Sequence, residues 1–342
     1  MIPSITDIRR SLSDCQSSFS RLTAMRPVEG CRPQRTSRFA EFGVAWREGR
    51  WLLCTPLTAD AVGSVERMAS QLKRVRSEFL TDYEVYRSEL EFADSAGGRH
   101  ACDVVMQRMP DGASLQDVAA VSSRERLCGR LRQMQREFAR MGFAHNNLKP
   151  CNIILADDER PVAVRYHFAS FGDDAGKADA AAFDELERYV MSLPESDEES
   201  PLPSAGESAP DRGVMLPGGC ERVGTEHEQM VVIRREGMYG YADARGTIVV
   251  APQFDSAGDF REGRAEVEYA GRMGLVDKSG KYVIAPEWEY LEYRDDCGIS
   301  LVLSDGMWSA IDYEGHPTGI RCAAVADVCR LLRERMNIVV EP

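Results

Sequence analysis

Polar side chains of the kinds that bind nucleotides and metals are concentrated in one short segment, residues 143–155. It reads Phe-Ala-His-Asn-Asn-Leu-Lys-Pro-Cys-Asn-Ile-Ile-Leu and contains His145, Asn147, Lys149 and Asn152. One hypothesis is a remnant nucleotide site in which the amide oxygen of Asn152 is a metal ligand. The alternative is structural: His145 hydrogen-bonds to the backbone and Asn152 to its neighbours, so that these side chains only hold the loop.

The elements before this segment are expected in the order strand, strand, helix, strand, strand, and a further helix leads directly into it. Alternation of apolar and polar residues predicts the strands, and apolar residues spaced by three and four predict the helices. The expected strands cover residues 40–46, 51–54, 83–92 and 101–106, and the helical stripes cover residues 65–79 and 127–141. Another helix is expected over residues 179–193.

Residues 143–155 resemble the catalytic loop of the protein-kinase family. The likeness is greatest to a group of bacterial kinase-like proteins whose loop reads F-A-H-G-D-L-K-P-D-N-I-L and which also carry WG repeats. Residues 109–115 follow a strand and resemble the hinge between the two kinase lobes. The resemblance covers roughly residues 39–193. It implies an α+β chain: a degenerate two-lobed protein-kinase-like fold plus a C-terminal β-rich repeat domain.

Two acidic groups of the kinase mechanism are replaced in this chain. In kinases one Asp accepts the proton of the attacking hydroxyl and a second Asp binds Mg²⁺. The first position is Asn147, whose amide is not a base, so the resemblance implies a rate deficit of about 10²–10⁴. The second falls on Arg165, thirteen residues after Asn152. Ser170-Phe171-Gly172 is an alternative register that needs a five-residue insertion; on either register the metal carboxylate is missing.

Other working parts of a kinase are missing as well. Cys54 or Thr55 takes the position of the Lys that holds the nucleotide phosphates, no Gly-x-Gly-x-x-Gly loop precedes it, and residues 165–179 are too few for an activation segment. We therefore expect no catalysis, no cofactor and no metal site. A remnant cleft would be lined by Cys54, Met106, Met109 and Asn152.

A different pattern repeats in the C-terminal third. Residues 239–246 recur as residues 273–280 and, less well conserved in pattern, as residues 308–315, with periods of 34 and 35. These units resemble WG repeats, whose pattern is roughly aromatic-Gly-Tyr-Ile-Asp-x-x-Gly-x-x-Val-Ile-x-Pro-x-Phe/Tyr. The Asp-x-x-Gly pieces predict tight hairpin turns. The third unit keeps Trp308 but lacks the Gly after it. Such repeats stack because one unit cannot bury its own apolar face.

Composition divides the rest of the chain. We expect an N-terminal helical flank over residues 1–38, the kinase-like domain over 39–193, an acidic disordered linker over 194–228, about three β-repeats over 229–320, and a capping helix within 321–342. The linker prediction rests on a run rich in Pro, Ser, Gly and acidic residues with almost no aromatic residues, which cannot bury enough apolar surface to fold.

The expected function is that of a non-catalytic pseudokinase whose WG-like repeats bind protein partners, as a scaffold or regulator. The alternative is an atypical ATP-dependent phosphotransferase, for which ATP and Mg²⁺ would be the cofactors. The net charge of −13 argues against nucleic acid and an anionic membrane surface as partners. The ten cysteines form no C-x-x-C pair, and the first residues lack a signal-peptide pattern, so we expect a cytoplasmic protein. The residues do not indicate an oligomeric state.

Overall fold

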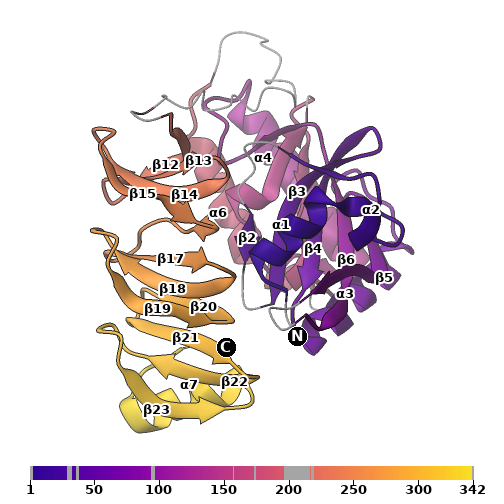
Figure 1. Cartoon of the computed structure of the whole chain (residues 1–342). Helices are drawn as coiled ribbons and strands as arrows, with labels where there is room; N and C mark the ends of the chain where they lie inside the picture. Colours follow the sequence, from indigo (N-terminus) through magenta and orange to yellow (C-terminus); the bar gives the residue numbers. More distant parts are fainter. Residues whose placement is uncertain are drawn as a thin grey trace.

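The computed structural model describes residues 3–28, 33–35, 38–93, 97–156, 158–172, 175–195, 216 and 219–340 (Figure 1). It is a mixed α/β structure whose C-terminal region is rich in strands. We refer to residues 3–109 as the sheet lobe, residues 110–195 as the helical lobe, and residues 216–340 as the repeat array. None of the helices in these described stretches combines the length and apolar character that a membrane crossing requires.

The sheet lobe is built on a six-stranded antiparallel sheet with the order β1-β3-β4-β6-β5, in which β2 also pairs with β3. The strands are β1 (Arg26–Pro27), β2 (Gln34–Arg35), β3 (Phe39–Trp46), β4 (Gly49–Pro56), β5 (Tyr83–Ala93) and β6 (Arg99–Met109), and the helices are α1 (Ile5–Ser13), α2 (Cys15–Ser18) and α3 (Ala59–Leu72). The predicted order of two strands, one helix and two strands is present as β3, β4, α3, β5 and β6.

The N-terminal flank is part of this lobe, which corrects the boundary predicted at residue 38. It adds β1 and β2 to the sheet, and α1 covers one sheet face with Ile5, Ile8 and Leu12 in a shared apolar core. The helical flank contains two helices, α1 and α2, because the chain leaves helical geometry at Asp14. The helix expected to reach Phe79 ends at Leu72, and Phe79 instead packs into the core from an irregular segment.

The helical lobe contains two long helices that pack together around large aromatic residues. Its elements are β7 (Gly112–Ser114), α4 (Arg124–Met141), β8 (Phe143–Ala144), η1 (Pro150–Asn152), β9 (Ile153–Ala156), β10 (Pro161–Ala163), η2 (Tyr166–Phe168), β11 (Ser170–Phe171), α5 (Ala175–Ala178) and α6 (Ala180–Ser192). Gly142 ends α4 in the left-handed conformation, and the chain turns directly into β8. Phe138, Phe143, Tyr166 and Phe183 are fully buried and fix the segment of interest between α4 and α6.

The repeat array consists of three four-stranded antiparallel sheets stacked one after another, which Figure 1 shows beside the two lobes. The strands are β12 (Glu221–His227), β13 (Met230–Arg235), β14 (Met238–Asp243), β15 (Ile248–Phe254), β16 (Ser256–Ala257), β17 (Arg264–Tyr269), β18 (Arg272–Asp277), β19 (Tyr282–Trp288), β20 (Tyr290–Arg294), β21 (Ile299–Ser304), β22 (Met307–Ile311) and β23 (Pro317–Cys322). The sheets share apolar cores, and helix α7 (Val325–Met336) packs on the last one.

The first repeat begins earlier than predicted. Strand β12 lies inside the region expected to be a linker, because Glu221–Val223 pair with β13 and complete the first sheet. Of the remaining expected linker, residues 196–215, 217 and 218 lie outside the described residues.

Candidate functional site

The segment predicted to carry chemistry forms a loop between β8 and β9, with His145 completely buried. The backbone N–H of Asn147 donates to His145 Nδ1 over 3.3 Å, so the proton of the neutral ring is on Nε2, which donates to the carbonyl oxygen of Val164 at 2.8 Å. Burial lowers the pKa of His145. The ring therefore stays neutral with both nitrogens used by the backbone, and neither is left for proton transfer.

Asp179, which the sequence reasoning did not single out, holds the other side of the loop. Its two carboxylate oxygens accept the backbone N–H groups of His145 at 2.5 Å and Asn146 at 2.9 Å. Asp179 is buried and directly precedes α6. Its hydrogen bonds therefore tie the start of this helix to the loop. Its position at the start of the helix expected over residues 179–193 was the only sequence signal for it, and that signal does not indicate a contact with the loop.

Arg165 links the loop to the sheet lobe. Its Nε lies 2.9 Å from Glu41 Oε2 on β3, and its Nη1 donates to the carbonyl oxygen of Cys151 at 3.1 Å and lies 3.5 Å from Asn152 Oδ1. Its backbone N–H donates to Gln107 Oε1 on β6 at 2.8 Å, with φ at 62°, in the left-handed region. The oxygen of Asn152 that would be the metal ligand is therefore turned toward a cation.

The remaining polar residues of the loop contribute in different ways. Asn152 is buried, and its Nδ2 donates to the backbone carbonyl of Asn147 at 2.8 Å. Lys149 is exposed and directly precedes η1. The structure thus brings Asn147, Asn152 and Arg165 together, with Asn152 acting on a neighbour's backbone.

Glu41 is the carboxylate of this site, and sequence reasoning missed it. Burial opposes its ionisation, but the hydrogen bond from His167 and the charges of His167 and Arg165 prevail and hold the pKa of Glu41 at about 2. His167 Nε2 lies 2.9 Å from Glu41 Oε1. The sequence did contain a signal for Glu41. Its neighbours in β3, which point to the opposite face of the sheet, are apolar and pack on the α1 side, so Glu41 points inward on the α3 side.

Cys54 faces Glu41 directly across the β3–β4 ladder. It is fully buried, and burial followed by the nearby charge of Glu41 raises the pKa of its thiol well above the ordinary value. A neutral thiol provides no charge for a phosphate. Glu66, on helix α3, is paired with Arg87 on β5 at 2.6 Å, and its side chain is one-third exposed. The Lys–Glu pair that orients nucleotide phosphates in kinases therefore has no counterpart at Cys54.

The four residues expected to line a remnant cleft do not share one surface. Cys54 packs in the core on the α3 side of the sheet, whereas Met106 packs with α1 on the opposite side. The reason is register: Met106 pairs with Leu53, and adjacent residues of a strand point to opposite faces. Met109 is half-buried at the end of β6, next to Pro110.

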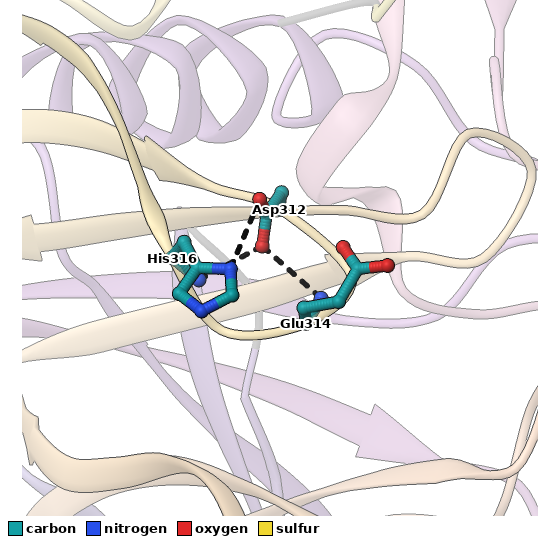
Figure 2. A group of neighbouring side chains, drawn as sticks. All are labelled: Asp312, Glu314 and His316. Atoms are coloured by element: carbon teal, nitrogen blue, oxygen red, sulfur yellow. Dashed lines mark hydrogen bonds and ion pairs between the residues drawn. The ribbon is translucent and has the colours of Figure 1, made fainter.

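The hairpin turns of the array form a second cluster of polar groups. In the third repeat, Asp312, Glu314 and His316 approach one another closely enough to suggest a metal site (Figure 2). Asp312 Oδ1, however, accepts the backbone N–H groups of Glu314 at 3.1 Å and His316 at 2.8 Å. Asp243 and Asp277 make the same two bonds in the other repeats, to Arg245 and Thr247 and to Ser279 and Lys281. The shared role of these carboxylates is to close the turn.

The glycine of the repeat pattern lies where two neighbouring strands approach each other closely. A Cβ atom on Gly240 would lie 2.4 Å from the carbonyl oxygen of Val250, and one on Gly274 would lie 2.8 Å from that of Ile284. Both sites face an irregularity in the ladder just before Pro252 and Pro286. The third repeat pairs Trp308 with Cys322, fourteen positions on, where the others pair residues fifteen positions apart. The shorter strand connection explains why Ser309 is tolerated there.

Comparison with known proteins agrees with this reading of the array. Residues 239–272 and 273–308 each match the family model described as WG containing repeat. The predicted WG repeats are therefore confirmed over residues 239–308. No curated protein gives a significant match to the chain.

Proposed function

We propose that this chain is a non-catalytic, protein-kinase-like protein that binds a protein partner through its repeat array, as a scaffold or regulator. The proposal has two parts, one for the lobes and one for the array. They rest on different observations and are tested separately.

The kinase-like part is supported by the order of elements and by the loop. An antiparallel sheet with one inserted helix precedes a long helix, and that helix leads into a polar loop with the spacing of a kinase catalytic loop. Arg165 lies beside Asn152, which supports the register that places it at the metal-binding Asp over the one that uses Ser170.

The observation that carries the non-catalytic part is a reversal of charge. Kinases place a cation on the sheet and a metal-binding carboxylate after the loop, so that both act on the nucleotide phosphates. Here the sheet supplies the carboxylate Glu41, and the position after the loop supplies the cation Arg165, and the two are paired at 2.9 Å. Since Arg165 also bonds to the loop carbonyl of Cys151, the charges satisfy each other and need no nucleotide or Mg²⁺.

The interaction part is supported by the repeats. WG repeats are consistent with a protein-interaction role. The array also exposes several large apolar side chains, Val249, Tyr269 and Tyr282, each about two-fifths exposed or more. Exposed aromatic side chains are favoured at protein interfaces.

The lobes are tested by a thermal-shift titration of the full chain with ATP, with and without Mg²⁺. A ligand present at 100 times its Kd adds about 2.7 kcal/mol of stability. We expect no Mg²⁺-dependent shift. A clear shift with Mg²⁺ that disappears in Asn152→Ala would overturn the non-catalytic assignment and favour the ATP-dependent phosphotransferase instead.

The array is tested by partner capture with the full chain as bait. Replacing Tyr269 and Tyr282 by Ser should reduce recovery of the partner, whereas the matched change Met191→Ser on α6, also an exposed apolar residue, should not. Equal recovery with all three chains would argue against the array as the binding surface.

A further inference from the structure

A carboxylate of the repeat array is buried against the sheet lobe. Glu268 lies on β17 and is 2% exposed. Its oxygens accept the backbone N–H of Thr6 at 3.1 Å, the hydroxyl of Thr6 at 3.3 Å and, more distantly, the backbone N–H of Ile5 at 3.4 Å. The guanidinium of Arg35, on β2, lies 3.6 Å away.

The lobe groups that Glu268 meets are those that a helix leaves unsatisfied. The first N–H groups of a helix have no acceptor within it, and they carry the positive end of its dipole. In α1 the capping box between Ser4 and Asp7 satisfies the N–H groups of these two residues. The N–H groups of Ile5 and Thr6 have no acceptor from the capping box, and Glu268 of the array accepts both. Hydrogen bonding and the helix dipole both favour an acceptor at this place.

Further contacts surround Glu268 on both sides. Arg9 Nη2 donates to the carbonyl oxygen of Asp255 at 2.6 Å, and Arg35 Nη2 donates to that of Glu289 at 2.8 Å. A Cβ atom on Gly271 would lie 3.2 Å from Ser4 Oγ, and φ at this glycine is +76°, so the β17–β18 turn also approaches the helix closely. Figure 1 shows α1 and β2 on the side of the sheet lobe that faces the array.

We infer that these contacts form a joint, centred on Glu268 and the start of α1, that fixes the repeat array to the sheet lobe. The joint consists of Ile5, Thr6, Arg9 and Arg35 on the lobe and Asp255, Glu268 and Glu289 on the array. The array is therefore attached to the sheet lobe by contacts between residues more than 200 positions apart. This attachment does not depend on the length of chain between α6 and β12.

The joint responds to pH because Glu268 is charged and enclosed. Burial raises the pKa of Glu268, and the charge of Arg35 only partly offsets this. The charged groups that face Glu268 are Arg35 from β2 and Asp255 from the array. Asp7 accepts hydrogen bonds within the capping box, and Arg9 donates to the backbone carbonyl of Asp255. A raised pKa means that the docked state holds the proton more tightly than the undocked state. Docking is thus strongest below the ordinary pKa of Glu and weakens as pH rises through the raised pKa.

Hydrogen exchange of the full chain tests the joint directly. The variants are Glu268→Ala, Glu268→Gln, and Glu287→Ala as a control on an exposed glutamate of strand β19 in the same sheet. We expect Glu268→Ala to speed exchange in the peptide over residues 5–9 about tenfold at pH 7, as the loss of hydrogen bonds to two amides implies. Glu268→Gln retains an acceptor without the charge, so its protection should match or exceed that of the parent and should no longer fall with pH.

Peptides from α4 and β21 report whether each variant is folded. If Glu268→Ala and Glu287→Ala give the same exchange at residues 5–9 in folded chains, the joint is overturned. Should Glu268→Ala fail to fold, Arg35→Met provides the second test, because it leaves the Glu268 charge without its nearest cation and should also speed exchange at residues 5–9. Unchanged exchange in that variant would equally contradict the proposal.

Discussion

Arg165 and Glu41 lie 2.9 Å apart although 124 positions separate them. Arg165 follows the loop of the helical lobe, and Glu41 is a buried residue of strand β3 in the sheet lobe. Their pair connects the helical lobe to the sheet lobe.

Removing Arg165 should destabilise the protein because it leaves Glu41 charged and enclosed without its ion-pair partner from the helical lobe. Breaking a buried pair costs about 3–5 kcal/mol, and Arg165 is one-fifth exposed, so we expect a loss near 3 kcal/mol for Arg165→Met in urea denaturation. Arg188→Met, which breaks an exposed pair with Glu185, should change the free energy of unfolding by no more than about 1 kcal/mol. The double variant Glu41→Met with Arg165→Met should recover most of the loss; equal losses in all chains would contradict the role of the pair.

The same pair predicts that the free energy of unfolding decreases at acid pH. The pKa of Glu41 is about 2 in the folded protein against an ordinary value of 4.5, so its contribution is fully present above pH 4.5 and is lost as pH falls toward 2. The shift corresponds to about 3 kcal/mol in total. Urea midpoints measured between pH 6 and pH 3 should fall less steeply for Glu41→Gln than for the parent. Parallel curves would show that Glu41 does not titrate as inferred.

The repeat glycines should not tolerate a methyl group. Gly240→Ala and Gly274→Ala each place a Cβ atom against a backbone carbonyl of the next strand, and forced overpacking costs about 1–3 kcal/mol. Gly129→Ala is the matched control, because this glycine lies in α4 with open space around its Cβ position and should gain up to about 1 kcal/mol. Thermal unfolding distinguishes the two cases, and a neutral Gly240→Ala would mean that the strands separate easily.

The turn aspartates should be replaceable by Asn but not by Ala. Asp277 accepts bonds from the backbone N–H groups of Ser279 and Lys281 and from the Ser279 hydroxyl, and these bonds, the hydroxyl first, lower its pKa. Losing them in Asp277→Ala should cost about 1–2 kcal/mol, whereas Asn keeps the accepting oxygen and should cost less. Glu287→Ala serves as the neutral comparison. If the Ala and Asn variants were equally stable, the glycine of the turn, and not the aspartate, would be the residue that stabilises it.

Local patterns predicted the repeats well. The periods of 34 and 35, the Asp-x-x-Gly turns and the alternation of strands each depend on residues a few positions apart, and each four-stranded sheet realises them. In the repeats, backbone geometry fixes the outcome over short distances. The resemblance to kinases also suggested Arg165 as a site residue, through its spacing of thirteen residues from Asn152, and that role stays a prediction.

The partners of these residues could not be predicted in the same way. Nothing near Glu41 in the sequence indicates that it meets Arg165, and nothing near Glu268 indicates that it meets Thr6, because both contacts depend on how separate elements pack. The predicted linker was too long for a related reason: residues 221–223 have no strong strand pattern and form a strand because β13 offers an unpaired edge. The flank was separated from the lobe because its short strands carry too few residues to show a period.

The two outer surfaces of the array differ from the surfaces between its sheets. Leu216 and Cys220 pack on the outer face of the first sheet with Val231 and Ile233, and α7 packs on the last. A duplicated repeat would find a matching apolar face only between existing units, since at either extremity it would have to displace one of these coverings. The array should therefore accept an added unit between existing sheets more readily than at either end.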